Sequence, residues 1–127
     1  MIYMLDTNTS SFIIKGLIPK ERLAGKKILI SSIVAAELYY GAYKKGSLRL
    51  MEVVEVFLRT FEVVPFDLAA AKEYGKLRAK LEKRGEVIGA YDLQIAAHAL
   101  AIGAVLVSDN EREFRRIEGL KVQNWRK

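Results

Sequence analysis

Residues 2–8 read Ile-Tyr-Met-Leu-Asp-Thr-Asn, four apolar residues followed by an acid and two residue types that often begin helices. An apolar run without alternation is typical of a strand buried on both faces, and Asp, Thr and Asn are common N-caps. The segment therefore predicts a buried strand that leads directly into a helix, with Asp6 at the junction. Such junctions are where parallel sheets bind ligands.

The same order of strand and helix recurs along the chain. Apolar runs predict strands at 2–5, 27–31, 61–66, 104–107 and 121–125, and Pro65 marks the third as an edge or a strand end. Capping residues and helical periodicity predict helices at about 32–43, 47–61, 67–84, 89–102 and 110–116. Apolar strands separated by helices predict an α/β fold of three layers, α/β/α, with a central, mostly parallel sheet.

Composition limits the possible chemistry. The 127 residues include 21 Lys and Arg, 15 Asp and Glu, one His and no Cys, for a net charge of +6. Disulfides, thiol nucleophiles and zinc sites built on Cys or several His are excluded. The length suits a single domain spanning 1–127. A basic excess attracts polyanions without identifying one.

No targeting signal is expected. Asp6 falls where a signal peptide would carry its apolar region. The apolar stretch 95–107 contains His98 and is too short to span a bilayer. The sequence therefore predicts a cytoplasmic protein with no membrane segment.

Two further acids lie within helices, on the side that apolar residues share. Asp92 has Ile95, Ala96 and Ala99 at i+3, i+4 and i+7, so it lies on the apolar stripe of its helix. Glu37 is flanked in the same way by apolar residues one turn before and after it. A buried carboxylate needs a partner, which is either a Lys or Arg side chain or a bound cation.

Asp109 follows the strand at 104–107 as Asp6 follows the first strand, and either residue alone is explained as an N-cap. Taken together, Asp6, Asp109, Glu37 and Asp92 are placed to meet in one pocket, where their charges would repel unless a cation held them. Carboxylate ligands favour Mg²⁺ or Mn²⁺, which suits a chain with no Cys and one His.

Four segments carry a resemblance to a known family: MLDTN at 4–8, SSIVAAELYYG at 31–41, IGAYDLQIAAHALAIG at 88–103 and LVSDNEREFRRIEGLKVQNW at 106–125. In their order and spacing the chain resembles PIN-domain ribonucleases, and more narrowly the VapC toxins of VapBC toxin–antitoxin pairs. The resemblance implies that Asp6, Glu37 and Asp92 are the first three acids of the family's metal site, with Asp6 and Asp92 as metal ligands.

The fourth position of that site stays open. The family often has an acid four residues before the Phe that is Phe114 here, where this chain has Asn110, with Asp109 and Glu113 close by. We include Asp109 among the catalytic residues and Asn110 among those that support them. By the same resemblance, Thr7 and Asn8 orient the first carboxylate or a metal-bound water.

The resemblance also implies an activity and partners. The expected reaction is Mg²⁺-dependent endonucleolytic cleavage of RNA that leaves a 5′-phosphate and a 3′-hydroxyl, with Mn²⁺ as a possible substitute. The expected partners are the RNA substrate, a VapB-like antitoxin helix bound in a groove, and a second copy of the chain in a homodimer. The alternative is a non-catalytic PIN module that binds nucleic acid or regulates, because its fourth ligand is incomplete.

Other conspicuous residues have plainer interpretations. His98 is six residues after Asp92, hence on another face of the helix, and is expected to be packed or on the surface. Three tyrosines, Tyr39, Tyr40 and Tyr43, could stack on bases beside the lysines at 44 and 45, but their helical spacing favours core or subunit packing.

Nucleotide-binding glycine motifs and a nucleophile elbow are absent. Lys15, Lys44, Lys45 and Arg78 are candidate RNA contacts.

Overall fold

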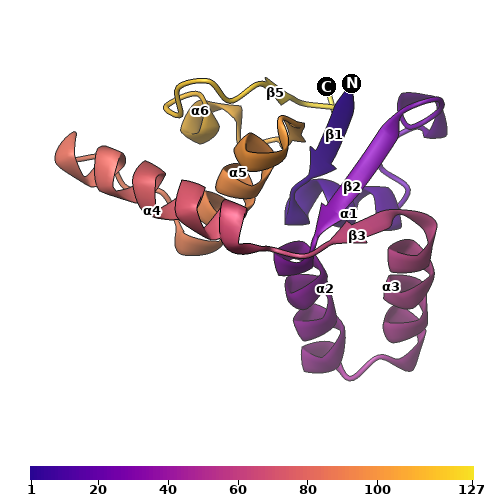
Figure 1. Ribbon diagram of the computed structural model, residues 1–127. Coiled ribbons are helices and arrows are strands. Elements are labelled where there is room, and N and C mark those ends of the chain that lie inside the picture. The colour runs from indigo at the N-terminus through magenta and orange to yellow at the C-terminus, as the bar shows by residue number, and fades with distance from the viewer.

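The computed structural model describes residues 1–127 and contains one five-stranded sheet (Figure 1). Its strands are β1 (Ile2–Leu5), β2 (Lys27–Ser31), β3 (Glu62–Val64), β4 (Val105–Val107) and β5 (Val122–Gln123). They lie in the order β3-β2-β1-β4-β5, and every neighbouring pair is parallel. The α/β/α prediction is confirmed, with a sheet that is parallel throughout.

The helices begin where the sequence predicts caps. They are α1 (Thr7–Ile14), the 3₁₀ turn η1 (Lys20–Arg22), α2 (Ser32–Lys45), α3 (Leu48–Thr60), α4 (Leu68–Lys83), α5 (Ala90–Ile102) and α6 (Glu111–Phe114). The side chains of Asp6, Ser31, Ser47 and Asp67 each accept a hydrogen bond from a backbone N–H in the first turn of their helix. The last predicted helix ends at Phe114, two residues earlier than expected.

The strand order places a switch point beside β1. From β1 the chain adds β2 and β3 on one side, and after the helical segment it adds β4 and β5 on the other. Ligands of open parallel sheets bind at the carboxyl ends of the strands that flank such a point. Those strands are β1 and β4, so the residues that follow them, Asp6 and 108–110, lie at the expected binding edge.

The core lies on both faces of these two central strands. Met4 and Leu5 of β1, Leu106 and Val107 of β4, and Phe114 of α6 are completely buried. In Figure 1, α2 and α3 pack as a pair below the carboxyl edge of the sheet, while α4 and α5 lie together on the opposite side from α3. None of the helices is both long and apolar enough to cross a membrane.

Two of the three tyrosines of α2 lie outside the core. Tyr40 and Tyr43 are 65% and 64% exposed, so they do not pack in the core of this chain, and their packing against a second subunit stays a prediction. Tyr39 is half-buried, its hydroxyl donates a hydrogen bond to Glu55 of α3 at 2.8 Å, and its ring stacks on Tyr43. Tyr39 thus contacts α3. The outer side of α2, which carries Tyr40 and Tyr43, is not covered by any other element of the chain.

Candidate functional site

Asp6 is fixed at the boundary between β1 and β4. Its Oδ1 accepts the Thr9 N–H at 2.8 Å as the N-cap of α1, and its own N–H donates to the carbonyl of Val107 at 3.0 Å. The residue is only 3% exposed. Burial raises the pKa of Asp6, and the Ser108 hydroxyl and the Thr9 N–H partly offset the rise.

Glu37 reaches the same edge from the middle of α2. It is half-buried, and its Oε1 accepts a hydrogen bond from the Thr7 hydroxyl at 2.9 Å. Thr7 therefore orients Glu37 rather than the carboxylate of Asp6 that precedes it. Asn8 is exposed in the first turn of α1, and no hydrogen bond ties its side chain to a carboxylate.

Asp92 is surrounded by the other acids. It lies in the first turn of α5, half-buried, and its pKa is raised from 3.8 to about 6. Burial is the largest cause, followed by the negative charges of Asp6, Glu113, Glu37 and Asp109 in that order. The charges of acids from both sheet and helices therefore reach Asp92, although the structure does not gather three of them into a metal-ion site.

The plainer explanation of the helical acids fails. None of the six ion pairs in the structure includes Asp6, Glu37 or Asp92, although the chain is rich in Lys and Arg. The N-cap interpretation of Asp6 is correct, but it occupies only one carboxylate oxygen. The negative charges of Asp6 and Glu37 raise the pKa of Asp92, and no cation of the protein pairs with these three carboxylates.

The loop after β4 supplies several polar groups. Ser108 is completely buried, its hydroxyl lies against Asp6, and its Oγ accepts the Asn110 N–H at 2.9 Å. Asn110 donates from Nδ2 to Glu113 Oε2 at 2.7 Å, whereas Asp109 is exposed. The charge of Glu113 raises the pKa of Asp92 more than the charge of Asp109 does. Ser108 was missed as a site residue, although it follows β4 directly as Asp6 follows β1.

The donor set suits a hard divalent cation. All the converging groups are carboxylates, which are preferred by Mg²⁺ and Mn²⁺, and a cation between them would relieve the repulsion that raises the pKa of Asp92. In this conformation, however, no three acidic or histidine side chains are directed at one point.

Residues 3–120, nearly the whole chain, match the PIN domain family. The chain belongs to the PIN-domain family. It is 42% identical to Ribonuclease VapC2 of Haemophilus influenzae over 129 residues, covering 97% of both proteins. It is 41% identical to the tRNA(fMet)-specific endonuclease VapC of Salmonella typhimurium over 128 residues, again covering 97% of both.

Solved structures show the same relationship. The PIN domain superimposes on a chain of the DNA-bound VapBC complex from Salmonella typhimurium with a TM-score of 0.91, at 43% identity and 98% coverage of both chains. It also matches VapBC2 of Rickettsia felis bound to a promoter DNA fragment with a TM-score of 0.90, at 42% identity, covering 98% of this chain and 99% of that one. The resemblance to VapC proteins is confirmed over the full length.

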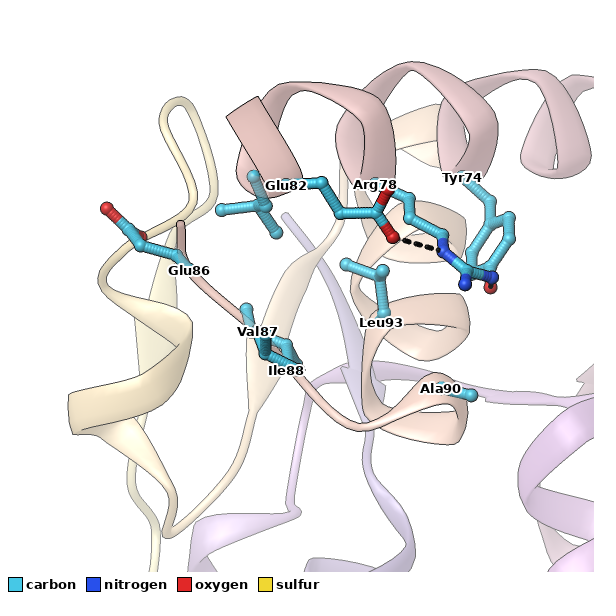
Figure 2. Close-up of a pocket in the computed structure, with 9 residues that line it drawn as sticks. Tyr74, Arg78, Glu82, Glu86, Val87, Ile88, Ala90 and Leu93 are labelled. Atoms are coloured by element: carbon cyan, nitrogen blue, oxygen red, sulfur yellow. Dashed lines mark hydrogen bonds and ion pairs between the residues drawn. The ribbon is translucent and has the colours of Figure 1, made fainter. Parts of the chain in front are cut away.

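A separate pocket of the PIN domain lies away from these acids. Figure 2 shows this pocket of about 150 Å³ between α4 and the start of α5. Arg78, a candidate RNA contact, pairs there with Glu82 at 3.0 Å and also donates to the Tyr74 hydroxyl. Its guanidinium group therefore already has a carboxylate partner within the chain. Glu86 turns away from Arg78 in this view. The acids of the sheet edge do not line this pocket.

His98 is packed inside the PIN domain, as expected. It is 1% exposed, its Nδ1 lies 2.8 Å from the Ser31 Oγ, and its ring packs at a right angle to that of Phe66. Because Ser31 Oγ already accepts the Ile33 N–H, its hydroxyl hydrogen is free to donate to Nδ1. Burial lowers the pKa of His98, which favours this neutral form. The histidine joins α5 to the start of α2.

Proposed function

We propose that this PIN domain is a metal-dependent endoribonuclease and the toxin of a VapBC-type toxin–antitoxin pair. The observation that carries the proposal is the environment of Asp92, a half-buried carboxyl group whose pKa is raised to about 6 by burial and four further acids. A protein gains nothing in stability from such an arrangement. Strongly perturbed acids gathered at a binding edge are typical of functional sites.

Each residue has a definite role in this proposal. Asp6 and Asp92 hold the ion, and Glu37, with Asp109 or Glu113, completes the ligands or positions water. Thr7 fixes Glu37 through its 2.9 Å hydrogen bond, and Ser108 and Asn110 hold the loop after β4. When bound, Mg²⁺ or Mn²⁺ would shield the phosphate, stabilise the leaving oxygen and provide an activated water.

The substrate is RNA, cleaved to leave a 5′-phosphate and a 3′-hydroxyl. Because the similar Salmonella typhimurium protein is named a tRNA(fMet)-specific endonuclease, initiator tRNA is the first RNA to test. A non-catalytic, nucleic-acid-binding module is the second candidate. It is favoured by Asn110 in place of an acid and by the fact that no three acids point at one centre.

Metal removal separates the two candidates. We expect initiator tRNA to be cut in the presence of Mg²⁺ or Mn²⁺, and cutting to stop with EDTA and to return when the metal is restored. Gel analysis of end-labelled tRNA measures the cleavage, and calorimetry measures metal binding. Glu21→Gln replaces an exposed acid on η1 that is not among the acids acting on Asp92, so it serves as a control and should cleave normally. Metal-independent cleavage, or RNA binding without any cleavage, would favour the second candidate or a contaminating nuclease.

An antitoxin and a second copy of the chain complete the proposal. We expect co-expression with the adjacent small open reading frame to yield a stable complex of toxin homodimers in the cytoplasm, with nuclease activity suppressed. Size-exclusion chromatography with light scattering measures the stoichiometry, and the tRNA assay measures inhibition. The separated toxin should regain activity after the antitoxin is removed by denaturation and refolding. A product that neither binds nor inhibits would contradict the toxin interpretation.

A further inference from the structure

A groove extends from the acidic site along the surface between α1, α2 and α3. Its volume is about 230 Å³, and it is lined at one end by Thr7 and Glu37 of the site. Its other end is lined by Lys15, which follows α1, and Lys45, the last residue of α2. A ligand bound in this groove would therefore contact the carboxylates and the two lysines at once.

Gly41 keeps the groove open at its middle. It lies one turn after Glu37 and one turn before Lys45, in the interior of α2, and it lines the groove. Glycine weakens a helix interior relative to alanine, and no atom lies within 4 Å of the position that a Cβ would take. Packing within the monomer therefore does not require glycine, and a larger side chain would occupy groove space instead.

The lysines at the basic end of the groove have no acidic partner within the chain. Neither Lys15 nor Lys45 belongs to any ion pair of the structure, and both are exposed. Lys44, next to Lys45 in the chain, does not line the groove, and its Nζ lies 5.8 Å from the centre of the exposed Tyr40 ring. Two ammonium groups without a partner at one end of the groove are suited to bind the phosphates of a nucleic acid.

We infer that this groove is a nucleotide subsite, which takes the unpaired RNA residue next to the phosphate that is cut. This inference rests on the proposed nuclease function and specifies how the substrate is held. The apolar floor, which includes Leu38 and Ala42, accepts a base or ribose, and Lys15 and Lys45 bind the adjacent phosphate. The groove thereby directs the chain of the RNA across the acids.

Gly41→Leu tests the subsite, with Gly75→Leu as its matched control. Gly75 is also a helix-interior glycine with nothing within 4 Å of its Cβ position, but it lies on α4 away from the groove. We expect Gly41→Leu to raise the KM for tRNA at least about tenfold with little change in kcat, whereas Gly75→Leu should match the wild type. Calorimetric Mg²⁺ affinity should be the same in all three proteins.

Binding without cleavage gives an independent measurement. In EDTA, the affinity for a fluorescein-labelled single-stranded oligoribonucleotide should fall by a similar factor in Gly41→Leu. Lys15→Ala and Lys45→Ala should each reduce the slope of log affinity against log salt by about 0.7. These exposed lysines can be replaced without burying or exposing core, so they remain informative even if Gly41→Leu folds poorly.

The outcomes distinguish the inference from the function on which it rests. If the wild type cleaves RNA but neither KM, affinity nor salt slope changes in the groove variants, the subsite is refuted while the nuclease function stands. If Gly41→Leu loses antitoxin binding and keeps its RNA affinity, the groove belongs to the antitoxin and the inference is wrong. If the wild type neither cuts nor binds RNA, the proposed function fails first.

Discussion

Asp6→Asn is expected to abolish metal-dependent cleavage, by more than about 100-fold, and to leave the fold intact. The loss should exceed the 10–100-fold effects typical of residues that only support a metal ligand, because this variant removes a ligand charge itself. The fold should survive because Asn is as good an N-cap as Asp. Its Oδ1 can still accept the Thr9 N–H that Asp6 accepts at 2.8 Å.

The chain offers a matched control for this substitution. Asp67 caps α4 in the same way, accepting the Ala70 N–H at 3.0 Å, but it is exposed and lies outside the acidic site. Asp67→Asn should therefore cleave tRNA like the wild type, with an equal melting temperature. Asp6→Ala, by contrast, should also lose about 0.5–2 kcal/mol of stability with its cap. Undiminished cleavage by Asp6→Asn would remove Asp6 from the metal site.

The elements of this fold were predictable because local chemistry and tertiary packing agree. Ser31, Ser47 and Asp67 cap helices in the structure as their residue types predict, and Gly46 and Gly103 end helices with positive φ of 64° and 78°. The uninterrupted apolar strands required cover on both faces, which only a parallel sheet between helices provides. Sequence and fold are consistent at each of these points.

The site was only partly predictable, because its details depend on side-chain directions between distant segments. Helical periodicity predicted that Glu37 and Asp92 face inward, and both are half-buried. It could not show that Thr7, thirty residues away, donates a hydrogen bond to Glu37. Nor could it rank Glu113 above Asp109, since that ranking depends on how α6 is placed against α5. The choice between core and subunit packing for the tyrosines of α2 stayed open for a related reason, because helical spacing predicts which residues share a face and not what covers that face.

Asp92→Asn is expected to stabilise the metal-free protein at neutral pH while abolishing cleavage. The pKa of Asp92 is about 6 in the folded state against an ordinary value of 3.8. Between these values the folded state keeps a proton that the unfolded state has lost, so stability falls as pH rises from about 4 to about 6. Above that range the charged carboxylate carries its full penalty, which the neutral amide does not.

The shift corresponds to at most about 3 kcal/mol, and screening of this half-buried group reduces the expected gain to about 1–2 kcal/mol, or roughly 4–8 °C in melting temperature. Thermal unfolding of wild type, Asp92→Asn and Asp67→Asn in EDTA at pH 4, 5, 6 and 7.5 measures it. The advantage of Asp92→Asn should be present at pH 7.5 and disappear by pH 4, and added Mg²⁺ should stabilise the wild type but not this variant. A variant that is less stable than the wild type at pH 7.5, or an advantage that persists at pH 4, would mean that the charge of Asp92 is already compensated in the metal-free fold.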